Sequence, residues 1–395
     1  MRKNIFLLGG SADDNCGLSS VDEPAKAEAP SIMSGTAKKK MLYIMGVDWD
    51  WIYQRPQILA EKLDRDFDVT VAFPRKIYRK PPVPDRRSTV RKRCFPILPL
   101  QEKNRIVGLF GRWLYKIIFR DYQQYDYIYI GYPLYESCIP EDYDGCVIYD
   151  CMDNHRAMLT APRRIRRIAE QEEELVGRCR LLLVSSETLR RKTNRVAGYD
   201  KAVLVRNGTG GFVSCPVKKP AVRKVYDIGY IGTIAEWFDY RLLQSSAEKN
   251  RRIRYHLIGP VLNRPAENGV IRYEGILPHD RLASAVENYD CLVMPFLVND
   301  IVSSVDPVKL YEYIAFGKCI ISVYYSELEH FRDFVYFYHT EEEYLALVEE
   351  LCRSGFPAKY NERQRAAFLA ANDWEERYRI LKKAIDGAQA QPRTG

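Results

Sequence analysis

Residues 300–322, DIVSSVDPVKLYEYIAFGKCIIS, decide the fold of this chain. Pro307 suits the first turn of a helix, because the N–H group that proline lacks would be unpaired there. Apolar residues then recur at helical spacing, and Gly317 can adopt the left-handed conformation that ends a helix. The apolar run at residues 319–323 has the length of a buried strand. The stretch therefore predicts a loop, a helix and a strand in that order.

Two charged residues near the start of this helix form a candidate binding site. Lys309 and Glu312 are three residues apart, so their side chains share nearly the same helix face. A helix N-terminus attracts phosphate, Lys309 adds a cation, and Asp306 can cap the helix. Glu312 can accept hydrogen bonds from the two hydroxyls of a ribose. The pattern predicts a site for a nucleotide diphosphate-sugar, and the alternative is a solvated ion pair between the two side chains.

Length and composition indicate two domains without a membrane span. The chain has 395 residues, 46% of them hydrophobic, and no apolar run approaches the ~20 residues that span a bilayer. The apolar part of the opening MRKNIFLLGG is too short for a secretory signal. Residues 1–40 lack periodicity, which predicts a disordered extension.

Cysteine and histidine usage predicts a cytoplasmic protein without a metal cofactor. The ten cysteines include no C-x-x-C pair, as expected of buried thiols in a reducing compartment. The five histidines show no metal-binding spacing. We therefore expect a protein that uses no metal and no other cofactor.

Positive charge is concentrated in one part of the chain. Residues 74–120 contain fourteen lysines and arginines and two acidic residues, although the whole chain has a net charge of only +8. Within them, residues 105–120 predict a helix with an apolar face that includes Trp113 and a separate basic stripe. The stripe consists of Arg105, Arg112, Lys116 and Arg120. We expect this helix to bind an anionic membrane surface. A core helix with a solvated basic edge is the alternative, and nucleic acid is disfavoured because no reading motif accompanies the charge.

Short apolar strands alternate with helical segments from residue 41 onward, which predicts an α/β protein with parallel sheets. A proline-containing linker separates two such series. They predict two Rossmann-like domains, 41–215 and 221–355, that face each other across a cleft. Charged helices over 360–386 follow them. No G-x-G-x-x-G occurs at the first strand–helix turn, which argues against a dinucleotide-dependent dehydrogenase.

Two loops of the first domain carry candidate acceptor-site residues. Ligands of doubly wound folds bind at the carboxyl ends of strands, and the loop after the first strand contains Trp49, Asp50 and Arg55. Tryptophans in such a loop can instead form a hydrophobic plug. The segment IYDCMDNHR brings Asp153 and His155 to another strand end, where Asp153 can deprotonate an acceptor hydroxyl. The alternative role of Asp153 is to cap the next helix.

In the second domain, IGYIGTIAEWFD places Gly232 at the end of a strand, followed by Thr233 and Glu236. The absence of a side chain at Gly232 lets backbone N–H groups approach a diphosphate. These residues extend the candidate donor site.

Three motifs resemble those of known glycosyltransferases. The segment 306–313, DPVKLYEY, followed by a small residue and glycine, resembles the donor-binding helix of GT-B glycosyltransferases of the family 4-like group, nearest the teichuronic acid transferase subgroup. The W-x-x-x-R-P-Q arrangement from Trp51 to Gln57 resembles the same subgroup. The spacing of Tyr149 and Asp153 resembles a strand of the more distant xanthan glucuronosyltransferase.

The resemblance implies a GT-B fold in which the last helix crosses back onto the first domain. It also implies contact between the nucleotide base and the turn at Ile276 and Leu277. The group usually has two glutamates separated by seven residues; Glu312 matches the second, with an implied role at the ribose, and Ser304 replaces the first. The arginine and lysine that often follow Gly232 are also missing, which leaves Lys309 as the leading cation.

We therefore expect sugar transfer from a nucleotide diphosphate-sugar to a lipid-linked or oligosaccharide acceptor in bacterial surface polysaccharide synthesis. It would take place at the inner face of the cell membrane, with Lys309 stabilising the leaving diphosphate. Ser304 and Asp153 favour inversion of the anomeric configuration. The family resemblance favours retention and covers most of residues 41–385, so retention is the outcome that we expect. A non-hydrolysing nucleotide-sugar epimerase and a non-catalytic sugar-nucleotide-binding subunit are the alternatives, the second favoured by Ser304.

Overall fold

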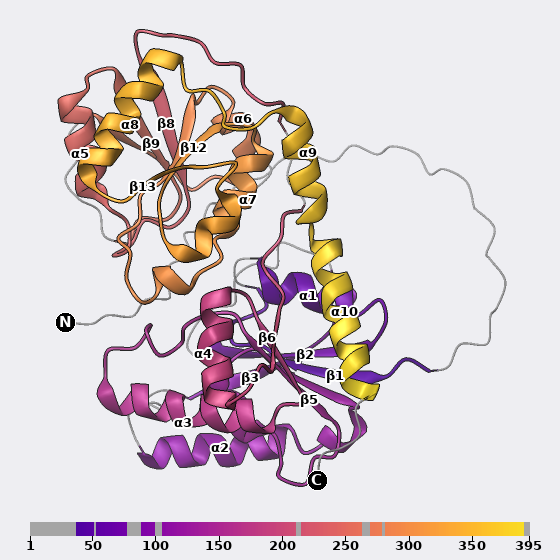
Figure 1. Cartoon of the computed structure of the whole chain (residues 1–395). Helices are drawn as coiled ribbons and strands as arrows, with labels where there is room; N and C mark the ends of the chain where they lie inside the picture. Colours follow the sequence, from indigo (N-terminus) through magenta and orange to yellow (C-terminus); the bar gives the residue numbers. More distant parts are fainter. Residues whose placement is uncertain are drawn as a thin grey trace, which may run out of the picture.

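The computed structural model describes residues 37–50, 53–76, 88–98, 105–210, 215–262, 269–278 and 281–390. The extension predicted over residues 1–40 lies mostly outside these ranges, as does Trp51. Within them the chain forms two α/β domains, each built on a parallel sheet, and two C-terminal helices run from the second domain back along the first (Figure 1). Among the described helices, none combines the length and apolarity that crossing a membrane requires.

The first domain contains a seven-stranded parallel sheet with the order β3-β2-β1-β4-β5-β6-β7. Its strands are β1 (Lys40–Ile44), β2 (Asp68–Lys76), β3 (Arg91–Ile97), β4 (Tyr127–Ile130), β5 (Cys146–Cys151), β6 (Leu181–Val184) and β7 (Ala202–Leu204). Its helices are α1 (Arg55–Leu63), α2 (Arg105–Ile118), α3 (Pro162–Arg178) and α4 (Glu187–Ala197). The strand order reverses at β1, between β2 and β4. Ligands of such sheets bind beyond the carboxyl ends of the strands at this switch point.

The second domain repeats the arrangement with a six-stranded parallel sheet, β10-β9-β8-β11-β12-β13. Its strands are β8 (Tyr226–Ile231), β9 (Ile253–Ile258), β10 (Ile271–Gly275), β11 (Cys291–Met294), β12 (Cys319–Val323) and β13 (Tyr336–Tyr338). Its helices are α5 (Tyr240–Lys249), α6 (Leu282–Val286), α7 (Val308–Ala315) and α8 (Glu341–Ser354). The switch point lies at β8, between β9 and β11.

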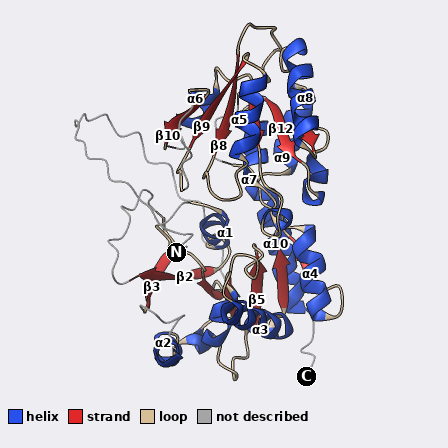
Figure 2. Cartoon of the chain, turned by 90° about the vertical axis from the view of Figure 1, so that its left-hand side faces the viewer, coloured by secondary structure: helices blue, strands red, loops and turns tan. Residues whose placement is uncertain are grey.

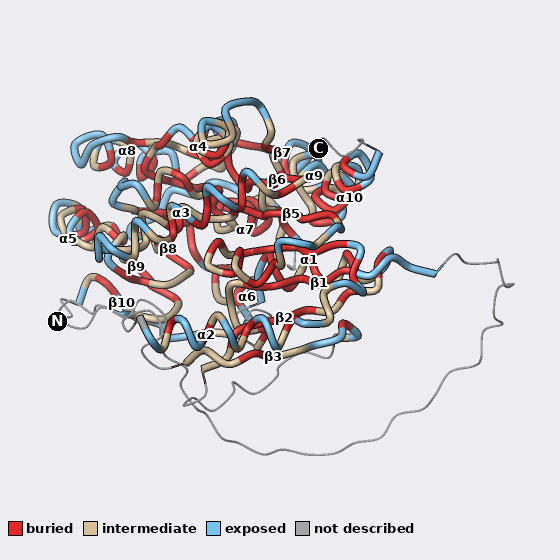
Figure 3. The backbone as a smooth tube through the Cα atoms, turned by 90° about the horizontal axis from the view of Figure 1, so that it is seen from below, coloured by how far each residue is buried: buried red, intermediate tan, exposed pale blue. Residues whose placement is uncertain are grey.

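Both faces of each sheet are covered, which explains the continuous apolar runs in the sequence. In β1, Met41 and Tyr43 pack into one hydrophobic core while Leu42 and Ile44 pack into another, on the opposite face of the sheet. Every residue of β4 and of β12 is buried. The buried strands stand out from the exposed helix surfaces in Figure 3.

Helix α7 and strand β12 confirm the loop, helix and strand predicted from residues 300–322. Pro307 is the N-cap residue, and Gly317 adopts the left-handed conformation (φ 65°) after the helix. A side chain at Gly317 would also clash with the linker, since an added Cβ would lie 2.8 Å from the carbonyl carbon of Pro216. Asp306 does not cap the helix with its side chain, contrary to our expectation.

Helices α9 (Glu362–Ala371) and α10 (Trp374–Ala390) return from the second domain to the first, as the resemblance implied (Figure 2). The side chains of Trp374, Tyr378, Leu381 and Ile385 are part of a core that also contains residues of β1, β2 and β4. The chain therefore passes between the domains twice. Strand β3 was not predicted, because RKRCFPI is the basic outermost strand of its sheet and only Phe95 in it is fully buried.

Candidate donor and acceptor sites

Three glycine turns meet at the carboxyl edge of the second sheet. Gly232, Gly259 and Gly275 terminate the neighbouring strands β8, β9 and β10, and all three have positive φ angles. The N–H of Gly232 donates to the carbonyl of Ile258, and that of Gly259 to the carbonyl of Gly275, both at 2.8 Å. An added Cβ at Gly259 would lie 2.8 Å from the carbonyl carbon of Gly232. Backbone thus packs on backbone at Gly232 and Gly259, which only glycine permits, whereas a Cβ added to Gly275 would have no neighbour within 4 Å.

Lys309 of α7 lies directly over the first of these turns. A Cβ added to Gly232 would overlap the Cε of Lys309 and lie 2.8 Å from its Nζ. The two residues were singled out separately in the sequence, and the fold brings them together. Substituting Gly232 would displace the lysine as well as strain the backbone.

Glu312 and Lys309 are both half-buried, yet they do not form the ion pair considered as the alternative. Among the described residues, neither side chain has a hydrogen-bond or ion-pair partner. Burial lowers the pKa of Lys309, opposed by the charge of Glu312. Burial raises the pKa of Glu312 to about 7, opposed by Lys309. Two desolvated and unpaired charges at a glycine-lined sheet edge are suited to a charged ligand.

The other predicted donor-site residues surround these turns. Thr233 is half-buried and its carbonyl accepts a hydrogen bond from Tyr230, whereas Glu236 is exposed. Ile276, directly after β10, is 65% exposed, and Leu277 packs against the core of the second domain. Ile276 therefore offers an apolar surface beside the glycine turns.

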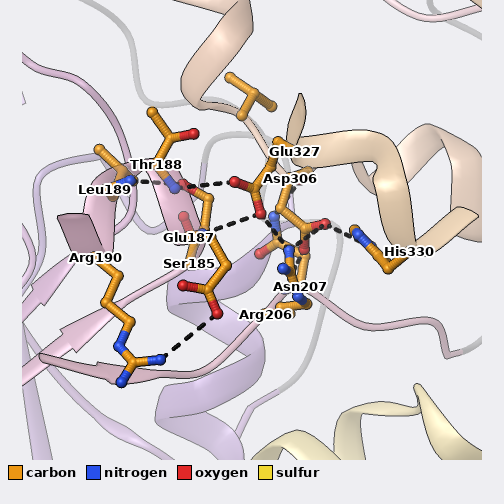
Figure 4. Close-up of polar contacts among 12 residues, drawn as sticks. Ser185, Glu187, Thr188, Leu189, Arg190, Arg206, Asn207, Asp306, Glu327 and His330 are labelled. Carbon is orange, nitrogen blue, oxygen red and sulfur yellow. Dashed lines mark hydrogen bonds and ion pairs between the residues drawn. The ribbon is translucent and has the colours of Figure 1, made fainter. Parts of the chain in front are cut away.

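Asp306 lies at the contact between the domains and not at the donor turn. Its fully buried carboxylate accepts hydrogen bonds from the backbone N–H of Asn207 (2.7 Å) and the hydroxyl of Tyr311 (3.1 Å). The guanidinium of Arg206 and the ring of His330 lie within 4 Å of it (Figure 4). Because these groups surround the carboxylate, Asp306 links the domains, and its predicted donor role is wrong for this arrangement.

Glu327, which the sequence analysis missed, completes this interdomain contact. It belongs to the 3-10 helix η5 (Ser326–Phe331) of the second domain and is buried. Its carboxylate accepts from the backbone N–H groups of Glu187 and Thr188, both at 3.0 Å, and pairs with Arg206 (Figure 4). A carboxylate from one domain thus caps helix α4 of the other. No local sequence signal marks Glu327, because its partners are more than 120 residues away.

Arg55 is part of the interior and does not line an acceptor site, which corrects our prediction. Its guanidinium donates to both carboxylate oxygens of Asp150, at 2.9 and 3.1 Å, and to the carbonyl of Val205 at 2.7 Å. Asp150 also accepts from the hydroxyl of Tyr129. Both charged residues are buried, so this pair fastens α1 to the ends of β5 and β7.

Asp153 differs from Asp150 although both belong to the carboxyl end of β5. It is half-buried, and its carboxylate has no hydrogen-bond or ion-pair partner among the described residues. Burial raises its pKa to about 7, opposed by the charge of Arg55. The capping alternative is wrong, because α3 begins only at Pro162 and its N-cap is Ala161. A carboxylate in this state is suited to accept a proton near neutral pH.

The remaining predicted acceptor-site residues are held by neighbours. His155 is buried, its ring packs edge-on against Tyr132 at 4.9 Å, and burial lowers its pKa to about 4. Trp49 is 7% exposed and belongs to the core, as the hydrophobic-plug alternative predicted. Asp50 pairs with Arg75, which also holds Asp48.

Helix α2 turns its apolar face outward. The exposed side chains are Ile106, Leu109, Phe110, Trp113 and Ile117, each at least 42% exposed. Phe110 and Trp113 stack on each other at 5.4 Å. The opposite face, with Tyr115, is buried. The core-helix alternative is therefore wrong. Lys116 and Arg120 are exposed beside this face and Arg112 is half-buried, whereas the side chain of Arg105 lies outside the described residues.

The described part of the chain contains no arrangement of side chains that could form a metal site. No cluster of three or more histidine, cysteine, aspartate or glutamate side chains in it is arranged to hold an ion. The ammonium group of Lys309 supplies a positive charge at the turn of Gly232.

Comparison with known proteins agrees with this geometry. No family model matches the chain. It is 23% identical over 286 residues to a Bacillus subtilis protein described as a teichuronic acid biosynthesis glycosyltransferase, TuaH, covering 65% of this chain and 70% of the relative. A sucrose-phosphate synthase from Thermosynechococcus elongatus has a similar structure, with a TM-score of 0.69 at 13% identity over 89% of this chain and 100% of that one.

Anabaena HepE, solved with UDP-glucose, has a TM-score of 0.58 at 11% identity over 89% of this chain and all of its own. The structural likenesses establish the two-domain GT-B fold, and the sequence likeness confirms the predicted resemblance to the teichuronic acid transferases. Together they identify the chain as a glycosyltransferase of the GT-B type.

Proposed function

We propose that this protein transfers a sugar from a uridine diphosphate-sugar to a lipid-linked or oligosaccharide acceptor in surface polysaccharide synthesis. The observation that carries the proposal is Lys309, a half-buried ammonium group without a side-chain partner among the described residues, directly over the turn at Gly232. UDP and UDP-glucose are bound by HepE, which has the same fold. In this chain the diphosphate would lie on the glycine turns against Lys309, with Glu312 at the ribose.

Asp153 is the proposed base on the acceptor side. Its carboxylate takes the proton of the acceptor hydroxyl while that oxygen forms a bond to the anomeric carbon. The bond from this carbon to the diphosphate oxygen breaks, and the electron pair leaves with the diphosphate, which Lys309 stabilises. A protein base of this kind gives inversion. The unpaired carboxylate with a pKa of about 7 supports inversion over the retention that family resemblance suggested.

We propose that helix α2 holds the enzyme on the cytoplasmic face of an anionic membrane. Its exposed apolar face would enter the interface, and the neighbouring cations would contact headgroups. Replacing Arg112, Lys116 and Arg120 by glutamate should weaken binding to phosphatidylglycerol vesicles about a hundredfold, at about 1 kcal/mol per cation. The control replaces Arg241, Lys249 and Arg353 of the second domain. Equal co-sedimentation of both variants, or self-association without lipid, would contradict the proposal.

The function is tested by incubating the protein with a panel of labelled nucleotide-sugars and with lipid-linked or saccharide acceptors. Formation of a glycosylated acceptor supports transfer, and NMR of its anomeric proton distinguishes inversion from retention. Epimerised donor without acceptor product would identify an epimerase, and binding without turnover a non-catalytic subunit. The same reaction with EDTA tests the metal-independent mechanism, which requires an unchanged rate.

A further inference from the structure

Asn154, the residue after the proposed base, connects the two candidate sites. Its amide Nδ2 donates across the domain contact to the backbone carbonyl of Asp300, at 3.2 Å. Its Oδ1 accepts from the ammonium of Lys192 on α4, at 2.9 Å. The side chain therefore holds one group of each domain.

The segment around Asn154 is fixed on its first-domain side. The hydroxyl of Ser185 donates to the carbonyl of Met152 at 2.9 Å. Glu172, buried in α3, pairs with Lys192 at 3.3 Å and with Arg156 at 2.8 Å. Residues 152, 154 and 156 are thus each anchored, whereas the carboxylate of Asp153 has no side-chain partner in the part of the chain that the structure describes.

On the other side of the contact, Asp300 lies in the loop that connects β11 to α7 and the candidate donor site. Its carbonyl also accepts from the hydroxyl of Ser304, at 3.2 Å. The backbone carbonyl of Ser304 in turn accepts from the hydroxyl of Ser186, at 2.7 Å. Lys309 follows five residues later in the sequence, as the second residue of α7. A shift of this loop on donor binding would therefore reach Asn154 directly.

We propose that Asn154 is a positioning residue that couples the donor loop to Asp153. The inference rests on the proposed transfer function and assigns a role that the sequence motifs did not. The bond to Asp300 exists only while the domains are in contact, so Asp153 is held in place when the donor loop is seated. Asn154 itself touches no reacting atom.

The test uses Asn154→Ala and Asn154→Asp, with Asn288→Ala as an exposed control. The aspartate variant keeps an acceptor for Lys192 but has no amide to donate to Asp300. We expect both variants to lower kcat about tenfold, with an unchanged Kd for UDP by calorimetry. They should keep the rise of kcat/KM with pH that Asp153 produces. A kcat within twofold of the parent, or a matching loss of UDP affinity, would overturn the inference.

A second measurement separates this inference from the transfer function. Hydrogen exchange should show that UDP protects the backbone amides of residues 152–156 in the parent protein and in Asn288→Ala. Asn154→Asp should lose that protection. If the parent transfers no sugar but this difference is present, the proposed function fails and the coupling stands. If UDP does not protect these amides in the parent protein, the coupling is overturned, whether or not the parent transfers sugar.

Discussion

Two regions of this protein withdraw charged side chains from solvent, and they differ in whether those charges are paired. At the contact between the domains, Arg206, Asp306 and Glu327 satisfy one another and the backbone around them. At the candidate sites, Lys309 and Asp153 are desolvated without a side-chain partner in the described chain. Pairing compensates the cost of burying a charge, and an unpaired charge retains that cost. The first region therefore stabilises the contact between the domains, and the second is where we propose that the ligands bind.

The largest effect is expected on stability, when a substitution removes one of the paired charges at the contact between the domains. Glu327→Ala removes one of the two carboxylates beside the half-buried Arg206 and leaves two backbone N–H groups at the start of α4 without their acceptor, so it should destabilise the protein by about 3–5 kcal/mol. The control is Glu329→Ala, two residues away, where the pair with Arg332 is exposed and adds little stability. Urea unfolding followed by circular dichroism measures both. Equal midpoints for the two variants would show that the interdomain pair adds no stability.

The next effect concerns the unpaired carboxylate. Asp153→Asn should lower kcat about a hundredfold, within the range of general-base catalysis, while the Kd for UDP stays constant. In the parent, kcat/KM should rise with pH and level off above about 7, because the carboxylate must lose its proton to act as a base. This rise should vanish in the variant. Full activity of Asp153→Asn, beside an equally active Asp333→Asn control, would remove Asp153 from the mechanism.

A smaller effect is expected for the unpaired cation. Lys309→Ala should weaken UDP binding about tenfold, because hydrogen bonds to charged groups contribute about 1.5–3 kcal/mol. Its melting temperature should not fall, because the ammonium has no side-chain partner to lose. Calorimetry and thermal unfolding measure the two quantities, with Lys249→Ala as an exposed control. If the affinity for UDP is unchanged, or if the variant is clearly less stable, Lys309 has a structural role like that of the paired charges.

The last expected effect is on stability as a function of pH. The folded-state pKa of Asp153, about 7, lies above its ordinary value of 3.8, so folding favours the protonated form. Between pH 4 and 7 the unfolded chain loses this proton first, and rising pH therefore lowers stability. Asp153→Asn removes that penalty and should raise the melting temperature at pH 8 more than at pH 5. An equal shift at both pH values would contradict the raised pKa.

The sheets could be predicted from the sequence because both of their faces are buried. Strands β4 and β6 begin and end where their apolar runs do. Strand β3 begins with three basic residues and a cysteine, none of which is buried. The sequence of β3 therefore does not mark it as a strand, and its extended conformation depends on pairing with β2.

The candidate site was predictable where its residues follow strand ends or helix starts. Gly232 and Lys309 were both identified from local patterns, and the switch-point rule explains why they meet. Asp306 and Arg55 were misassigned because their partners, Asn207 and Asp150, are about a hundred residues away. A polar residue near a strand end looks the same in sequence whether a ligand or a distant side chain satisfies it.

Helix α10 also determines when the first domain can finish folding. Trp374 and Leu381 are part of the core that covers one face of β1 and β2, although about 300 residues or more separate them from those strands along the chain. During synthesis, the face of the first sheet that packs against α10 therefore stays uncovered until the second domain has been translated. N-terminal domains usually fold first during synthesis, but here the N-terminal domain completes its core last, because that core includes the C-terminal helix.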